Sequence, residues 1–339
     1  MNRDVLNVGL IGAGRIGQIH ARNLSRSIPQ SNLCMVTDIV ESNALACAQN
    51  FRIPHAGTDH RDVIGNSDID AVVICSSTDT HAPIIAEAAK AGKHVFCEKP
   101  IDFDLDRIDD ALDAADQAGI VLQIGFNRRF DPNFQRIRKA VTTGEIGIPH
   151  QLHIISRDPA LPPREYLDKS GGIFMDMTIH DLDMARFLIG ADVTEIYAVG
   201  NALIDPSIAE IGDLDTVMVM LKFANGAIGI IENSRQAVFG YDQRAEVFGS
   251  DGKIAIDNVH PNTAQISSAD KIYKDPPLNY FLERYQDSYL EEMREFIKVS
   301  LNGGNSPVSG HESRIPVVMG KAALLSCQEN RPVSIGEIQ

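Results

Sequence analysis

A glycine-rich turn near the start of the chain constrains the fold more than any other feature. The turn Gly12-Ala13-Gly14-Arg15-Ile16-Gly17 follows the apolar run Val5–Ile11 and opens a segment with a helical pattern. Asp38 ends the next apolar run at about the spacing of 20 residues that a dinucleotide-binding motif expects. The first glycine permits the bend, the second admits a pyrophosphate, and the third lets helix and strand pack closely. The pattern predicts an NAD site rather than a glycine turn without a ligand.

The charge of the chain limits its partners. Its 339 residues carry a formal net charge of −15, whereas nucleic acids and anionic membranes bind basic surfaces. We expect a small-molecule substrate, and no nucleic-acid or membrane partner. We expect no signal peptide, and the sequence has no apolar run of the ~20 residues that cross a bilayer. The five cysteines lack the spacing of a zinc site, so we expect no metal and a cytoplasmic location.

Residues 1–125 alternate apolar runs with helical segments. The expected strands are Val5–Ile11, Leu33–Asp38, Ala71–Ile74, His94–Cys97 and Val121–Ile124. The expected helices are Ile16–Ser25, Ser42–Asn50, Pro83–Ala91 and Leu105–Ala118. Strands that are apolar throughout and alternate with helices predict an α/β domain with a doubly wound parallel sheet covered on both faces.

The pattern changes after about residue 150, where strands follow one another without helices. These runs are Asp215–Phe223, Ala227–Ser234, Arg244–Phe248 and Lys253–Asp257, and Asn225-Gly226 and Asp251-Gly252 are hairpin signals. We expect an NAD-binding domain over 1–125 and an α+β domain over 126–339 for substrate binding and oligomerisation, with the helix at His311–Asn330 returning to the first domain. One face of its sheet would bury against a second copy, unless its own helices cover it.

Two clusters of polar residues follow predicted strands, where ligands of a doubly wound sheet bind. Ser76, Ser77, Thr78 and His81 follow Ala71–Ile74, and small hydroxyls there suit a ribose or pyrophosphate. The alternative is that Thr80 caps the next helix. The full set of expected cofactor contacts is Gly12, Gly14, Arg15, Ile16, Gly17, Asp38, Ser76, Ser77, Thr78, His81, Glu98, Lys99 and Pro100.

The second of these clusters is Glu98-Lys99-Pro100, which follows His94–Cys97. An ammonium group there would lie in the nicotinamide crevice and stabilise a developing alkoxide. The alternative is a solvated surface lysine, and the position at a strand end favours the catalytic interpretation.

A third cluster contains Asp176 and His180, four residues apart on a predicted helix that places Met177, Met184 and Leu188 on another face. The aspartate would orient the imidazole and raise its basicity, so that the other ring nitrogen takes a proton. The alternative is an ordinary surface pair. Together with a cofactor site and Lys99, the pair is interpreted as a general base.

These motifs resemble the Gfo/Idh/MocA family of oxidoreductases over essentially the whole chain. Glu98-Lys99-Pro100 matches the family's Glu-Lys-Pro triplet, and Asp176 with His180 matches its later Asp-x-x-x-His pair. The resemblance implies an N-terminal Rossmann domain and a C-terminal domain with a large, open, mostly antiparallel sheet. It also implies a homotetramer formed through the open sheets, with a dimer as the alternative.

Within this family the chain is most similar to the inositol 2-dehydrogenase branch. The matching segments are Gln123–Asp131, Ser156–Pro159, Asp176–Arg186 and Gly240–Asp242. The resemblance implies that Asn127, Arg128, Asp158 and Tyr241 surround a polyol together with Lys99, Asp176 and His180. Each has a plain alternative, since Arg128 and Arg129 could be surface cations and Tyr241 a turn residue. A hydroxyl-only substrate requires such a dense set of hydrogen-bonding side chains.

The expected reaction is oxidation of a cyclitol ring hydroxyl by NAD⁺, specifically of myo-inositol to 2-keto-myo-inositol (scyllo-inosose). His180, oriented by Asp176, would remove the proton, and Lys99 would stabilise the oxyanion. One alternative is another polyol or sugar dehydrogenase, acting on scyllo-inositol or an aldopyranose. A different class, a non-catalytic NAD-dependent sensor, does not explain why the lysine and the Asp–His pair occur together.

Overall fold

The computed structural model describes residues 4–338 and divides into two compact units. Unit 1 comprises the chain up to Phe130 together with Asp287–Ile315, and unit 2 comprises Asp131–Gln286 and the segment from Pro316 onward. The division expected from the sequence, at 125 and 126, differs from this because a late segment rejoins the first unit. That segment carries helix α10 (Gln286–Asn302) and only the first residues of α11 (Gly310–Glu329).

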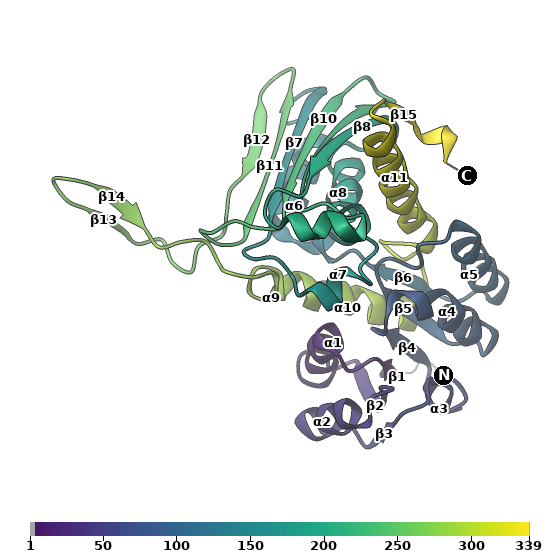
Figure 1. Cartoon of the computed structure of the whole chain (residues 1–339). Coiled ribbons are helices and arrows are strands. Elements are labelled where there is room, and N and C mark those ends of the chain that lie inside the picture. The colour runs from purple at the N-terminus through teal and green to yellow at the C-terminus, as the bar shows by residue number, and fades with distance from the viewer. Residues whose placement is uncertain (1–3, 339) are drawn as a thin grey trace. The chain divides into compact units, whose positions relative to one another are not determined.

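Unit 1 is built on a six-stranded parallel sheet (Figure 1). In sheet order the strands are β3 (His55–Gly57), β2 (Ser31–Thr37), β1 (Leu6–Ile11), β4 (Ala71–Ile74), β5 (His94–Glu98) and β6 (Leu122–Gly125). Every neighbouring pair is parallel. This order, 3-2-1-4-5-6, is that of a doubly wound dinucleotide-binding sheet, so the predicted fold class is confirmed. The order reverses between β1 and β4, and ligands of such sheets bind at the carboxyl ends beside that point.

Local sequence explains the helices of unit 1. The Asp104 side chain accepts hydrogen bonds from the N–H groups of Asp106 and Arg107, and Gly119 at φ +63° ends the same helix, α5 (Leu105–Ala118). The other helices are α1 (Arg15–Arg26), α2 (Glu41–Phe51), α3 (His60–Ile64), the 3₁₀ turn η1 (Thr78–Thr80), α4 (His81–Lys90) and the 3₁₀ turn η2 (Asn127–Phe130).

The core of unit 1 explains why the late segment returns. Val8, Val73 and Phe96 from the sheet are fully buried in one cluster with Met293 and Phe296 of α10. Burying an apolar side chain stabilises a fold by about 1.5–3 kcal/mol, so α10 contributes to this core although it lies far along the chain.

Unit 2 contains a seven-stranded mixed sheet. In sheet order the strands are β12 (Lys253–Ile256), β11 (Asp242–Gly249), β7 (Pro149–Arg157), β10 (Ile228–Ser234), β9 (Thr216–Phe223), β8 (Val193–Asn201) and β15 (Val333–Ser334). Only β7 and β10 pair in parallel; the other neighbours are antiparallel. Antiparallel hairpins join β9 to β10 and β11 to β12, so the predicted hairpins and the mostly antiparallel sheet are confirmed.

Helices pack against one face of this sheet. Within unit 2, α6 (Pro132–Thr142) contacts β12 and α8 (Ile179–Ile189) contacts β7. The remaining elements are α7 (Arg164–Leu167), the π-helical segment η3 (Phe174–Thr178), the 3₁₀ turns η4 (Pro206–Ile211) and η5 (Ile335–Glu337), α9 (Phe281–Arg284) and the hairpin β13 (Gln265–Ser267) with β14 (Ile272–Lys274). Across residues 4–338, no helix is both long and apolar enough to cross a membrane.

Candidate active site

The glycine turn has the geometry that the motif requires. Gly12 has φ +93°, and a Cβ there would collide with the main chain of Cys75 and Ser76. A Cβ on Gly17 would collide with the carbonyl oxygen of Gly12, so helix α1 can approach β1 only with glycine at this position. In contrast, a Cβ on Gly14 would meet no protein atom within 4 Å. The turn is therefore tight behind and open in front, as a cradle for a pyrophosphate must be.

Asp38 is held beside this turn. Its Oδ2 accepts a hydrogen bond from the Ala13 N–H at 2.8 Å, and its Oδ1 accepts one from the Val40 N–H at 2.9 Å. The residue follows β2, next to β1 in the sheet. The carboxylate thus lies at the carboxyl edge of the sheet, where an adenosine ribose would bind. Arg15 and Ile16 begin α1 on the open side of the turn, and Arg15 is exposed.

The turns after β4 and β5 are joined by a buried histidine. The ring of His81 lies between two main-chain oxygens, with Nδ1 2.8 Å from that of Pro100 and Nε2 3.0 Å from that of Ser76. Burial lowers the pKa of His81, which favours the neutral ring. Ser77 is exposed and Thr78 is half-buried. The Thr80 hydroxyl contacts Ser76 Oγ at 2.6 Å and donates to the Ser77 carbonyl, so it does not cap α4 as the alternative interpretation required.

The Glu98-Lys99-Pro100 segment begins at the last residue of β5. Lys99 is half-buried rather than fully exposed, and its bond to Pro100 is cis. The Glu98 side chain points to His20 of α1, with Oε1 2.7 Å from the ring Nε2. The carboxylate of Glu98 is therefore engaged within unit 1 itself.

Asn127 and Arg128 lie on the turn η2, directly after β6. Both are buried, with 2% and 4% of their surface exposed, and Arg129 is also buried. The plain alternative of surface cations is therefore wrong for both arginines. Unit 1 thus brings the glycine turn, Asp38 and the turns after β4, β5 and β6 to one edge of its sheet.

In unit 2, Asp158 and Tyr241 lie at one end of the sheet. Asp242 pairs with Arg157 across β11 and β7, so the next residue on each strand, Tyr241 and Asp158, continues that register. Asp158 donates its N–H to the Ser234 carbonyl at 2.9 Å. Tyr241 is 6% exposed and contacts the ring of Tyr285 edge-on at 6.0 Å. It is a buried side chain, not an exposed turn residue.

Asp176 lies in the π-helical segment η3, and His180 lies in the first turn of α8. The sequence predicted a regular α-helix here; the π segment, with its wider turn, was not expected. Asp176 accepts a hydrogen bond from the Tyr166 hydroxyl at 2.6 Å and an ion-paired one from Arg235 at 2.9 Å. Burial and then the negative charge of Asp176 raise the pKa of Tyr166, so Tyr166 remains a donor.

Sequence reasoning missed Arg235, Tyr166 and Asp213. Arg235 is fully buried directly after β10, with its second nitrogen 3.6 Å from Asp213. Asp213 in turn accepts the N–H of Ile173 at 2.8 Å, just before the π segment. Asn233 of β10 also donates to Asp181 of α8 at 2.7 Å. These contacts fix η3 and α8 to the end of the sheet that carries Asp158, and no sequence spacing signals them.

The fold agrees with the comparisons with known proteins. Residues 6–126 match the oxidoreductase family described by an NAD-binding Rossmann fold, and residues 134–255 match the GFO/IDH/MocA C-terminal domain. The chain belongs to the GFO/IDH/MocA family of NAD-binding oxidoreductases, and the resemblance noted in the sequence is confirmed.

Particular relatives are similar over nearly the whole chain. It is 50% identical over 327 residues to an uncharacterized oxidoreductase of Bacillus subtilis, YrbE, covering 96% of each chain. It is 45% identical over 333 residues to the myo-inositol 2-dehydrogenase of Thermotoga maritima, covering 98% of this chain and 99% of that one. The structure of scyllo-inositol dehydrogenase from Lactobacillus casei with bound NAD(H) and scyllo-inositol has a TM-score of 0.92 at 28% identity, covering 98% and 99%.

Proposed function

We propose that this protein oxidises a secondary ring hydroxyl of a cyclitol with NAD⁺, converting myo-inositol to 2-keto-myo-inositol. The observation that carries the proposal is the cluster of polar side chains at one end of the unit 2 sheet. Asp158, Tyr241 and the Arg235-bound Asp176 gather there. A substrate that offers only hydroxyl groups needs such a concentration of donors and acceptors. The name of the Thermotoga maritima relative supports myo-inositol in particular.

The residues at the carboxyl edge of unit 1 fit the cofactor. The open space at Gly14 suits a pyrophosphate, and the Asp38 carboxylate suits the two ribose hydroxyls while repelling a 2′-phosphate. Ser76, Ser77 and Thr78 would contact the cofactor directly. Because both nitrogens of His81 contact main-chain oxygens, we expect it to support the turns after β4 and β5.

In the proposed mechanism, Lys99 and His180 act on the same hydroxyl group of the substrate. His180 takes the hydroxyl proton at a ring nitrogen while Asp176, held by Arg235 and Tyr166, orients the ring. When bound, NAD⁺ would supply the hydride acceptor, so that the same carbon becomes a ketone. Lys99 stabilises the negative charge that develops on the oxygen. Asn127, Arg128, Asp158 and Tyr241 would hold the remaining hydroxyls and so select among ring isomers.

A panel of cyclitols and sugars, offered with NAD⁺ or NADP⁺, tests the proposal. We expect reduced-nicotinamide absorbance with myo-inositol and NAD⁺, and a ketone at one ring carbon in the product. The main alternative is scyllo-inositol, which is bound in the similar Lactobacillus casei structure; an aldopyranose is the third arm. Turnover of an aldopyranose alone contradicts cyclitol oxidation. The absence of turnover with every compound in the panel also contradicts it and, if NAD still binds, favours a sensor.

Two variants test the assigned chemistry. Lys99→Ala and His180→Ala should each lower kcat by about 10²–10⁴-fold, the usual contribution of such groups, while NAD still binds. Lys90→Ala, on an exposed residue that ends α4, is the matched control. Near-normal turnover in Lys99→Ala or His180→Ala would remove that residue from the mechanism.

We also propose that the protein is a cytoplasmic homo-oligomer, a tetramer or a dimer. All five cysteines are free thiols, as in proteins of a reducing compartment. The face of the unit 2 sheet away from α6 and α8 exposes Met218, Met220, Ile228 and Phe248. An apolar face of this kind is typical of an interface between copies.

A further inference from the structure

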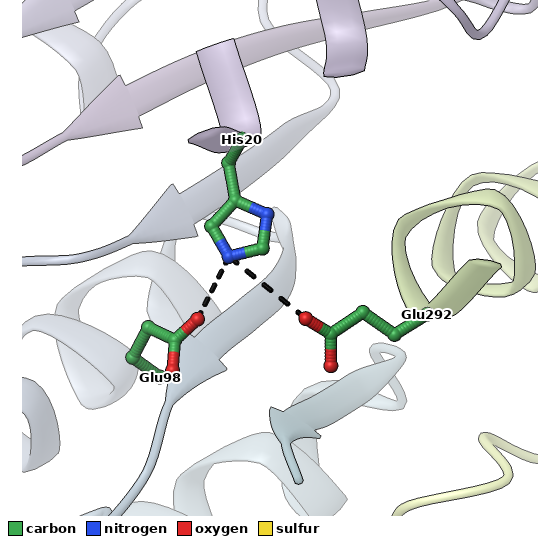
Figure 2. A group of neighbouring side chains, drawn as sticks. All are labelled: His20, Glu98 and Glu292. Carbon is green, nitrogen blue, oxygen red and sulfur yellow. Dashed lines mark hydrogen bonds and ion pairs between the residues drawn. The ribbon is translucent and has the colours of Figure 1, made fainter. Parts of the chain in front are cut away.

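Three side chains from distant parts of unit 1 meet in its interior (Figure 2). His20 comes from α1, Glu98 from the end of β5 and Glu292 from α10; we call them the His20 triad. His20 Nε2 lies 2.7 Å from Glu98 Oε1 and 4.0 Å from Glu292 Oε1. The side chains of His20 and Glu292 have no exposed surface, and that of Glu98 is 12% exposed. The side chain of Glu98, which we predicted to contact the cofactor, therefore points toward the buried His20 ring in the protein interior.

The packing around the triad leaves little freedom. The His20 ring meets Phe96 and Tyr289 edge-on, with centroids at 5.0 and 5.8 Å. On the other side, a Cβ at Gly125 would lie 2.9 Å from Glu98 Oε2, so the carboxylate rests against the main chain of β6. Gln123 of β6 donates to the main-chain oxygen of Glu292 at 2.7 Å. Residues of β5, β6 and α10 therefore all contact the triad.

The two carboxylates are in different environments. Glu98 accepts from His20, whereas neither oxygen of Glu292 has a hydrogen-bond partner among the described residues. An ionised carboxylate buried without donors costs several kcal/mol, and two buried carboxylates close together favour one proton between them. Burial and the charge of Glu98 raise the pKa of Glu292. Glu292 is therefore the neutral acid, and Glu98 is the acceptor for the His20 ring.

A metal ion is the competing explanation, because one imidazole and two carboxylates are suitable ligands and their ligand atoms lie within 4.8 Å of one another. The distances favour a proton. Two ligands of a tetrahedral zinc ion at about 2.0–2.1 Å from the metal are separated by roughly 3.3 Å. The 2.7 Å between His20 Nε2 and Glu98 Oε1 is instead the length of a charge-assisted hydrogen bond.

We infer that His20 is a positioning residue for Lys99, acting through Glu98, and that Glu292 closes the buried site as a neutral acid. Glu98 directly precedes Lys99, so fixing its side chain fixes the direction in which the chain leaves β5. On the far side of Lys99, His81 holds the carbonyl of Pro100 at 2.8 Å. Two buried histidines therefore hold the residues that flank the lysine. The inference rests on the proposed role of Lys99.

The experiment compares kcat, KM and NAD affinity in His20 variants of the full chain. His20→Phe keeps a flat ring but removes the donor to Glu98. We expect kcat to fall at least tenfold, since a misplacement of about 1 Å can cost ~10²-fold, with less than threefold change in the Kd of NAD. His20→Gln returns an N–H at similar reach and should recover most of the loss. His94→Phe, the same change at the start of β5, should leave kcat unchanged.

A double variant separates positioning from general damage. If His20 acts through Lys99, adding His20→Phe to Lys99→Ala lowers kcat no further. A further tenfold loss in that background, or no recovery in His20→Gln, overturns the inference while leaving Lys99 in the mechanism. Normal turnover of Lys99→Ala alone overturns the proposed role of the lysine instead. The competing metal site predicts three results: one divalent ion per chain, loss of activity with a chelator, and loss of affinity for that ion in Glu292→Gln. These results together would overturn the assignment of Glu292 as a neutral acid.

Discussion

Arg235 donates a hydrogen bond to Asp176 across 2.9 Å from a position with no exposed surface. Its other terminal nitrogen lies 3.6 Å from Asp213, so one guanidinium compensates two carboxylates. Asp213 holds the chain just before the π segment through the Ile173 N–H. The negative charge of Asp176, which the proposed general base His180 requires, is therefore compensated by the same guanidinium that compensates Asp213, the residue that holds the chain before the π segment.

Arg235→Met should therefore destabilise unit 2 and lower turnover. Removing one partner of a buried ion pair costs about 3–5 kcal/mol, because it leaves a buried charge without compensation. Urea unfolding measures the loss. The matched control is Arg61→Met, since Arg61 is 70% exposed and lies 3.6 Å from Asp59, where an ion pair contributes little. Equal losses in the two variants would contradict the assigned role of Arg235.

Asp38→Ala should weaken the preference for NAD⁺ over NADP⁺. The variant removes both the acceptor for the ribose hydroxyls and the charge that repels a 2′-phosphate. It also leaves the Ala13 N–H without its 2.8 Å partner. We expect the ratio of kcat/KM for the two cofactors to fall by about 10–100-fold, since each charge-assisted hydrogen bond contributes roughly 1.5–3 kcal/mol. Asp106→Ala, on the exposed face of α5, should leave the ratio unchanged; an unchanged ratio in Asp38→Ala removes Asp38 from the cofactor site.

Glu292→Gln should gain stability over the wild type as the pH rises. In the folded chain the pKa of Glu292 is raised by burial and by the charge of Glu98, so the folded state retains a proton that the unfolded chain releases. Below the ordinary glutamate pKa of about 4.3, Glu292 is protonated in both the folded and the unfolded chain, so it does not lower the stability. As the pH rises from there toward the folded pKa, the free energy of unfolding falls by up to about 1.4 kcal/mol per pH unit. A glutamine never ionises and has no such loss.

Unfolding curves at several pH values between about 4 and 8 measure this difference. The titratable groups around Glu292 include His20, Glu98 and the thiol of Cys75, whose pKa is raised by burial first and by the charge of Glu98 second. Glu291→Gln is the matched control, because Glu291 is an exposed neighbour on the same helix, 47% exposed. A pH-independent difference between Glu292→Gln and the wild type would show that Glu292 is ionised in the folded chain.

Local signals predicted most of unit 1. The bounds of β4 (Ala71–Ile74) and α5 (Leu105–Ala118) are those expected from the sequence, because buried parallel strands and capped helices are encoded within a few residues. The place of α10 could not be predicted in this way. Its Met293 and Phe296 resemble the apolar stripe of any helix, and only the tertiary structure assigns that stripe to the core of unit 1.

The site was predictable where its residues form a motif and not where they form contacts. The spacing of Gly12, Gly17 and Asp38 in the sequence is enough to predict their roles. Arg235 lies 59 residues from its partner Asp176, and no spacing connects them. The regular α-helix expected around Asp176 and His180 was also not found throughout, because a π-helix with its wider turn covers Phe174–Thr178. Such a segment occurs often at functional sites and has no sequence signature.

Met220→Lys should disrupt the proposed oligomer. Met220 is 58% exposed in the middle of β9, between Val219 and Leu221, which are buried on the helix-covered face. Stable interfaces bury about 800 Å² per partner with few charges at the centre, so a lysine there should weaken association at least tenfold. Leu45→Lys, at a similarly exposed apolar position on α2, is the control. Sedimentation velocity should show the wild type and Leu45→Lys as one oligomer and Met220→Lys as a smaller species. A monomeric wild type, or an unchanged Met220→Lys oligomer, would contradict assembly through this face.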